Sequence, residues 1–189
     1  FRSSTVMSSD GREQVIAFHM AGEMIGLDGI ASDVHSCDVI ALEDTEVCVL
    51  PYDRVLDVTT SLRSMGAHFH KILSREIVRQ HGIMLLLGSM HAEERLAAFL
   101  LNLSQRFEAR GYSRSEFVLR MTRAEIGSYL GLKLETVSRV LSRFSHDGLI
   151  QVNQKHVQIL NASGLRAIVS GQPAAADAGN YDDDISLEP

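Results

Sequence analysis

Cysteine is scarce in this sequence, which has two, Cys37 and Cys48, among 189 residues. No segment resembles a secretory signal, so two cysteines argue against a disulfide framework and for reduced thiols in the cytoplasm. Long apolar runs are also missing, since even the run at residues 83–87 stops at Gly88, whereas a membrane span needs about 18 apolar residues. We therefore expect no membrane association.

Motifs of catalysis are absent too. The sequence has no P-loop, dinucleotide fingerprint or nucleophile motif. Its one His-x-His pair, His68 and His70, is of the kind that binds metal in β-roll enzymes. The pair falls in a stretch with helical periodicity, where positions i and i+2 point to different faces and cannot converge on one metal. We expect a protein that is not an enzyme.

Charge is distributed unevenly along the chain. The net charge is −6, with 7 Lys and Arg against 12 Asp and Glu in residues 1–90, and none against 5 in residues 171–189. Residues 91–170 have 11 Lys and Arg against 7 acidic residues, a net +4. A basic segment attracts phosphate, and acidic flanks limit non-specific binding. This pattern favours a nucleic-acid partner for residues 91–170.

Residues 121–140 have the pattern of two short helices joined by a glycine. Gly131 stands where the chain must turn sharply and where a side chain would obstruct the turn. The apolar positions of the two helices can meet in one small core: Ile126, Leu130, Leu132, Val137 and Val140. The spacing predicts a helix-turn-helix, a fold that binds double-stranded DNA.

The outer face of the second helix presents Glu135, Ser138 and Arg139, followed by Ser142, at spacings i, i+3, i+4 and i+7. Arg can donate two hydrogen bonds to guanine and Glu can accept one from cytosine, each worth about 1–3 kcal/mol of discrimination. Standing alone, Glu135 and Arg139 would be an ordinary ion pair on a solvated helix, but the two-helix pattern favours base reading. Further polar residues are candidates for phosphate contacts: Thr122, Arg123, Lys133, Thr136 and Arg143.

Two short alternating runs, residues 149–152 and 156–159, follow a helix end at Gly148 and are joined by three polar residues. Such a hairpin is typical of the wing in a winged helix-turn-helix domain. An amphipathic helix at residues 91–103 precedes the helix-turn-helix. We therefore expect a winged helix-turn-helix domain over residues 91–170, and a disordered acidic tail over residues 171–189.

Residues 1–58 consist of short apolar runs broken by glycines and acidic turns, which predicts strands. The expected strands cover residues 13–20, 23–27, 39–42 and 46–50, with a turn at residues 9–12 and an exit from the sheet at Pro51. So few strands cannot close a roll, so we expect a partial, jelly-roll-like β-roll sensor domain whose N-terminal part is missing. The expected fold class is α+β.

Residues 59–90 have helical periodicity, which predicts one long helix between the two domains. Its apolar seam has one polar interruption and comprises Phe69, Leu73, Ile77, Gln80 and Met84. The helix could simply pack on its own domain. We favour a homodimer seam, because a helix-turn-helix usually reads paired half-sites from a two-fold dimer.

Several short segments together resemble a known family: AEERLAAF at residues 92–99, MTR at 121–123, IG at 126–127, YLGL at 129–132 and ET at 135–136. They resemble the cyclic-AMP receptor and fumarate–nitrate reduction regulator (Crp/Fnr) superfamily, and most closely its oxygen-responsive Fnr branch. The resemblance implies a transcription regulator that binds DNA as a dimer under low oxygen. It implies that Glu135, Ser138 and Arg139 read the half-sites of a TTGAT-like palindrome, and that surface loops, with the turn at residues 9–12 as one candidate, contact RNA polymerase. A plain hairpin turn is the other interpretation of that segment.

The same resemblance implies oxygen sensing through a [4Fe-4S] cluster. Cys48 matches the family's fourth thiolate ligand, whereas the three N-terminal cysteines of the family are absent from these residues, so this chain alone cannot assemble the cluster. Without the resemblance, Cys37 and Cys48 are each interpreted as small buried apolar residues. The alternative is a regulator of this family that lacks a cluster and responds to another effector. Cyclic AMP is not expected to bind, because residues 32–37 contain no Arg to meet its phosphate.

Overall fold

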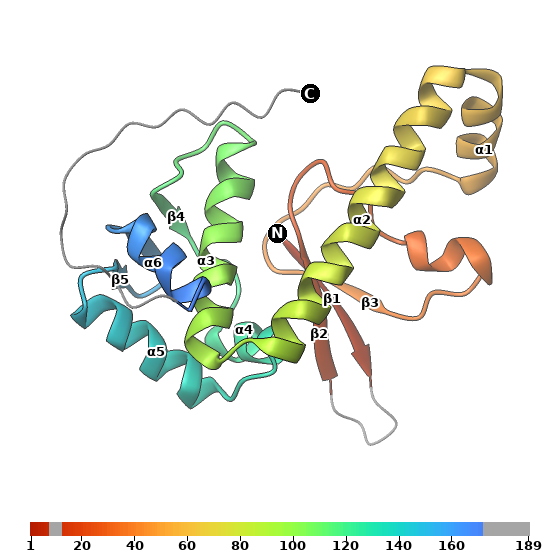
Figure 1. Cartoon of the computed structure of the whole chain (residues 1–189). Helices are drawn as coiled ribbons and strands as arrows, with labels where there is room; N and C mark the ends of the chain where they lie inside the picture. The colour runs from red at the N-terminus through yellow and green to blue at the C-terminus, as the bar shows by residue number, and fades with distance from the viewer. Residues whose placement is uncertain (8–12, 172–189) are drawn as a thin grey trace.

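The computed structural model describes residues 1–7 and 13–171, which form two small antiparallel sheets connected by a long helix (Figure 1). The turn expected at residues 9–12, with its candidate polymerase contact, lies outside the described residues. So do residues 172–189 of the expected acidic tail. The α+β class and the order of sheet, long helix and winged helix-turn-helix are confirmed.

The first sheet has the order β2-β1-β3 and comprises β1 (Arg2–Met7), β2 (Glu13–His19) and β3 (Asp38–Ala41). Both pairs of neighbours are antiparallel, and Arg2 lies opposite His19 on one side and Ala41 on the other. The short apolar runs at residues 13–20 and 39–42 therefore predicted two of these strands correctly.

Two other predicted strands are wrong. Residues 23–27 follow Gly22 and include Gly26, and both glycines have φ of +82°, a left-handed conformation that interrupts an extended run. A 3-10 helix (Leu27–Ala31) begins directly after Gly26. Residues 46–50 have no strand beside them within the described part of the chain, although the Arg2 guanidinium donates to the Glu46 carbonyl at 2.7 Å. Their apolar side chains are consequently exposed.

The helix expected over residues 59–90 is divided into α1 (Tyr52–Ser61) and α2 (Arg63–Ser89). The chain bends at Leu62, whose backbone is extended, with φ of −115° and ψ of 103°. The two helices cross closely beside Gly66, where an added Cβ would lie 2.8 Å from the Thr59 carbonyl oxygen. Residues 59–61 therefore belong to a separate helix, and the bend depends on a glycine at position 66.

The C-terminal domain begins with α3 (Ala92–Glu108), only two residues after α2 ends. It continues through β4 (Glu116–Val118), α4 (Arg123–Leu130), α5 (Leu134–His146), β5 (Ile150–Asn153), β6 (His156–Ile159) and α6 (Ala162–Val169). The second sheet has the order β4-β6-β5, so β4, which the sequence pattern did not predict, joins the wing hairpin as its third strand. The core gathers the largest fully buried apolar side chains of the domain, which include Leu96, Leu100, Leu103, Ile126, Leu130, Val137, Phe144, Ile150, Val157 and Leu165.

Strand β2 docks onto helices α3 and α4 of the C-terminal domain. The Phe18 ring lies 6.1 Å from Phe99 and 5.0 Å from Tyr129, and these two rings are 5.9 Å apart, which closes an aromatic triangle. The Val15 backbone N–H donates to Ser128 Oγ at 2.9 Å. The first sheet is therefore attached to helices α3 and α4.

Candidate nucleic-acid interface

Helix α4 begins with a reciprocal cap. Thr122 Oγ1 accepts from the Glu125 N–H at 3.2 Å, and the Glu125 carboxylate accepts from the Thr122 N–H at 2.6 Å. The helix ends at Gly131, which has φ of +63°. An added Cβ on Gly127 would lie 2.6 Å from the Leu132 carbonyl oxygen, so the turn between the helices needs both glycines. Local sequence thus determines the angle at which α5 follows α4.

Helix α5 is sharply divided into two faces. Its buried face contains Val137, Val140, Leu141 and Phe144. On the opposite face, Glu135 and Arg139 are exposed and Ser138 is half-buried, as expected for a helix that presents side chains to a major groove. The face predicted from spacing alone is therefore the outer face of this helix.

Arg139 is available to an external acceptor. The structure shows no ion pair between Glu135 and Arg139, and within residues 1–7 and 13–171 neither side chain has a hydrogen-bond partner. Arg139 lines a shallow groove between α5 and the start of α3, beside Glu93 and Glu94. The guanidinium can therefore make two parallel hydrogen bonds to a guanine edge without first breaking an internal bond.

The five candidate phosphate contacts differ in their surroundings. Thr122 caps α4, Lys133 is the residue before α5, and both are exposed, as is Arg123, whereas Thr136 is half-buried. Arg143 is exposed but pairs with Glu93 at the start of α3, and its Nε lies 3.7 Å from Asp147. A phosphate would have to compete with these two carboxylates for Arg143.

The wing is a tight hairpin. Asn153 pairs with His156 across a turn formed by Gln154 and Lys155, and Gln154 adopts a left-handed φ of +55°. The Lys155 carbonyl accepts from the Leu119 N–H at 2.8 Å, which attaches the tip to the strand-to-helix connection before α4. The tip thus presents an exposed lysine on the same domain as the recognition face.

The sequence patterns did not single out Arg95, which binds the C-terminal ends of both α2 and α4. Its guanidinium donates to the carbonyls of Met90 at 2.8 Å, Leu130 at 3.0 Å and Leu87 at 2.9 Å. Carbonyls at helix C-termini lack helical partners and carry partial negative charge, so one cation satisfies the ends of both α2 and α4. The arrangement connects the long helix directly to the helix-turn-helix. The only signal in the sequence was an arginine inside the AEERLAAF segment.

The predicted seam runs along α2. Ile77 and Met84 are 56% and 71% exposed, whereas Phe69 and Leu73 are half-buried. The Gln80 side-chain amide donates to the Glu76 carboxylate at 2.8 Å. Leu86 is the one fully buried residue among the described positions of this helix. Much of its apolar surface is therefore uncovered.

No helix among the described residues is long and apolar enough to cross a bilayer.

The two cysteines do not form a metal site by themselves. Cys48 is exposed and Cys37 is half-buried, and the described residues contain no group of three His, Cys, Asp or Glu side chains that could hold a metal ion. Burial and the nearby Asp28 carboxylate raise the pKa of the Cys37 thiol, which makes Cys37 a poor thiolate donor. A [4Fe-4S] cluster needs four thiolates, so the residues present do not fit one without ligands from elsewhere.

The 3-10 helix before β3 contains a carboxylate, Asp28, that accepts several hydrogen bonds. Asp28 accepts from the Ser36 N–H at 2.7 Å, from Ser36 Oγ at 3.2 Å and from His35 Nδ1 at 3.3 Å. These hydrogen bonds outweigh the effect of burial and lower the pKa of Asp28 to about 2. Donors that could have met an external anion are therefore already satisfied by an internal one.

The fold and the exposed recognition helix define a winged helix-turn-helix regulator, and comparisons with known proteins agree. The Crp-like helix-turn-helix domain matches residues 94–168, and the cyclic nucleotide-binding domain matches residues 3–61. The chain is 50% identical over 161 residues to the transcriptional regulatory protein btr of Bordetella pertussis, covering 85% of this chain and 66% of that protein. It is 44% identical over 168 residues to the fumarate and nitrate reduction regulatory protein of Vibrio cholerae, covering 87% and 67% of the two chains.

Among solved structures, FixK2 from Bradyrhizobium japonicum superposes with a TM-score of 0.79 at 30% identity, over 93% of this chain and 84% of that one. The chain belongs to the Crp/Fnr family of DNA-binding transcription regulators, whose members bind double-stranded DNA as dimers and are not enzymes. It spans about two thirds of the length of the curated relatives that it matches.

Proposed function

We propose that this chain is the greater part of an Fnr-type regulator that binds a TTGAT-like palindrome as a dimer. The observation that carries the proposal is the division of α5, whose apolar face is buried while Glu135 and Arg139 stand exposed on the other face. Arg139 contacts a guanine and Glu135 a cytosine, with Ser138 between them. Thr122, Arg123, Lys133, Thr136 and Arg143 contact the phosphates around the half-site.

The dimer forms along α2, with Ile77 and Met84 at the centre of the seam and Gln80 between them. The carrying observation is the exposed apolar surface of a helix that lies between the two domains. Two copies joined along this helix would place two recognition helices for half-sites one helical turn apart, about 34–36 Å. Activation further requires contact with RNA polymerase by surface loops, and the protein acts in the cytoplasm, where the DNA is.

Oxygen sensing is proposed through Cys48, as one ligand of a [4Fe-4S] cluster whose other three thiolates come from outside these 189 residues. The names of similar regulators, including the fumarate and nitrate reduction regulatory protein of Vibrio cholerae, and the exposure of Cys48 support this role. The second candidate is a regulator of this family that lacks a cluster and responds to another effector.

DNA binding tests the central proposal. We expect Arg139→Ala to weaken binding to a TTGAT palindrome by about 1–3 kcal/mol, which is roughly 5- to 150-fold in dissociation constant, and to reduce its preference over scrambled duplex. The matched control is Arg114→Ala, which removes an exposed arginine of the same domain that lies 3.7 Å from Glu108. Fluorescence anisotropy at fixed salt measures both. Unchanged affinity and preference in Arg139→Ala would refute base reading by α5.

A further inference from the structure

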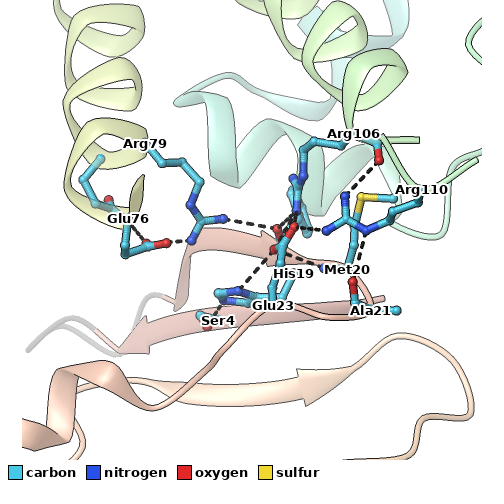
Figure 2. Close-up of polar contacts among 11 residues, drawn as sticks. Ser4, His19, Met20, Ala21, Glu23, Glu76, Arg79, Arg106 and Arg110 are labelled. Atoms are coloured by element: carbon cyan, nitrogen blue, oxygen red, sulfur yellow. Dashed lines mark hydrogen bonds and ion pairs between the residues drawn. The ribbon is translucent and has the colours of Figure 1, made fainter. Parts of the chain in front are cut away.

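Three arginines converge on the end of strand β2: Arg79 of α2, Arg106 of α3, and Arg110 in the turn after α3 (Figure 2). The Glu23 carboxylate, in the turn after β2, accepts from Arg106 Nη2 at 3.0 and 2.9 Å and from Arg110 Nη2 at 2.6 Å. Arg106 belongs to α3 and Arg110 to the turn directly after it, whereas Glu23 lies in the turn after β2 of the first sheet. The three side chains therefore form an ion-paired contact between the sensor part and the DNA-binding domain, which we call the Glu23 clamp.

Backbone carbonyls extend the clamp. Arg106 Nη2 also donates to the Phe18 carbonyl at 2.7 Å, and Arg110 Nε donates to the Ala21 carbonyl at 3.1 Å. The Phe18 carbonyl receives a second, longer bond of 3.5 Å from Arg79 of α2, which is paired with Glu76 at 2.7 Å. One carbonyl thus connects the long helix to the DNA-binding domain (Figure 2).

The side chains of the Glu23 clamp are largely shielded from solvent. The side chains of Arg106, Arg110 and Glu23 are 16%, 24% and 25% exposed, so salt screens their attraction less than it screens a surface pair. The buried His19 packs beside them and stays neutral near pH 7, since burial and then Arg79 lower its pKa to about 4. Loss of the Glu23 charge would leave Arg106 and Arg110 close together and uncompensated.

The clamp holds the side of the DNA-binding domain that faces the first sheet, whereas Glu135 and Arg139 stand exposed on α5. Only two residues separate α2 from α3, and such a short junction permits rotation unless other contacts prevent it. Docking of the first sheet through the clamp is therefore compatible with DNA binding. Together with Arg95 and the aromatic triangle around Phe18, it fixes the direction in which α5 points relative to α2.

We propose that Glu23 is a positioning residue that sets the orientation of the recognition helix relative to the long helix, and thereby the half-site spacing that a dimer reads. This proposal rests on the proposed function. The clamp acts on geometry and leaves the recognition surface itself unchanged. Loss of Glu23 therefore alters binding to paired half-sites and leaves binding to a single half-site intact.

The first experiment measures orientation without DNA. Spin labels are placed at Asp38→Cys on β3 and Ser142→Cys on α5, in a chain whose two native cysteines are serine, and pulsed electron resonance gives the distance distribution between them. We expect a narrow distribution in this parent and a broader one after Glu23→Gln. The matched control is Glu108→Gln, which removes an exposed pair with Arg114 inside the DNA-binding domain. Equally narrow distributions in all three proteins would overturn the proposal.

The second experiment measures spacing preference. Dissociation constants are compared for a palindrome, for the same palindrome with two inserted base pairs, and for a single half-site. Glu23→Gln is expected to weaken palindrome binding about tenfold, to reduce discrimination against the inserted spacing, and to change half-site affinity less than about twofold. Equal losses on all three duplexes would reduce Glu23 to a merely structural role. Failure of the unaltered chain to bind any duplex would refute the proposed function. The spin-label distances would still show whether Glu23 holds the orientation of α5.

Discussion

The two ends of this chain bury their apolar residues in different ways. The C-terminal domain has a core of its own, with Leu96, Leu130, Val137 and Val157 completely inaccessible to solvent. The described part of the N-terminal region has a few buried apolar side chains, all on β2 or just after it, and Phe18 packs against rings of the other domain. Most of the buried apolar residues therefore belong to the DNA-binding domain, whereas those of the N-terminal region pack against surfaces that other elements supply.

Apolar residues of the N-terminal region are also exposed to solvent. Val47, Val49 and Leu50 are 60%, 81% and 57% exposed, although each is a residue type that usually lies inside. They line a hollow together with the glycine-rich turn at residues 22–29. Apolar side chains arranged around a hollow in this way suit a region whose packing is completed by further chain or by a partner.

The largest expected effect comes from placing a charge in each region in turn. Val137→Asp puts an unpaired carboxylate into a fully buried position of α5 and should cost about 4 kcal/mol or more of unfolding free energy. Val47→Asp makes the same chemical change at an exposed position and should stay within about 0.5 kcal/mol. Urea unfolding followed by circular dichroism measures both. Similar losses in the two variants would contradict the contrast between the regions.

A smaller loss is expected where the two regions meet. Arg95→Ala removes three charge-assisted hydrogen bonds and leaves the carbonyls of Leu87, Met90 and Leu130 without this donor, at an expected cost of about 2–3 kcal/mol. Arg95→Lys should recover only part of this, because one ammonium cannot match the planar fork of donors.

The matched control is Arg123→Ala, which removes an exposed arginine at the start of α4 and should cost less than about 0.5 kcal/mol. Unfolding free energies from urea titration distinguish the three variants. An Arg95→Ala chain as stable as Arg123→Ala would show that the helix ends are held by packing alone.

The sequence allowed prediction of the features that depend on neighbours in the chain. The helix-turn-helix was predictable because the turn at Gly131 and the apolar spacing of the two helices both act within a few residues. The strand at β2 was predictable from its short apolar run. The bend at Leu62 was not, because helical periodicity continues across it and the cause is the close approach of Gly66 to α1.

Contacts between distant residues had no signal in the sequence. Glu23 and Arg106 are 83 residues apart, and Glu93 and Arg143 are 50 residues apart, so only the folded chain brings them together. Strand β4 has three residues, too few to show alternation. The apolar run at residues 46–50 misled the prediction, since a run of this kind becomes a strand only when another strand lies beside it.

In mild acid the expected effect is the smallest of these, and it should come from His19 in the first sheet. His19 is buried on β2, where Ser4 Oγ lies 2.8 Å from its Nε2, whereas His91, His146 and His156 of the C-terminal domain are exposed. Burial, followed by the positive charge of Arg79, lowers the pKa of His19 from 6.5 to about 4. An unfolded chain therefore binds a proton near pH 6.5 that the folded chain binds only near pH 4.

Between these values the unfolded state holds more protons, so stability is complete above pH 6.5 and falls as the pH drops toward 4, by at most about 1.4 kcal/mol per pH unit. His19→Gln should flatten this slope between pH 6.5 and 4.5, above the range in which the lowered pKa values of Asp28, Glu43 and Glu76 operate. His156→Gln, on the wing, is the control and should leave the slope unchanged. Urea unfolding at half-unit pH steps measures the slopes, and parallel curves for the unaltered chain and His19→Gln would place the acid sensitivity outside the first sheet.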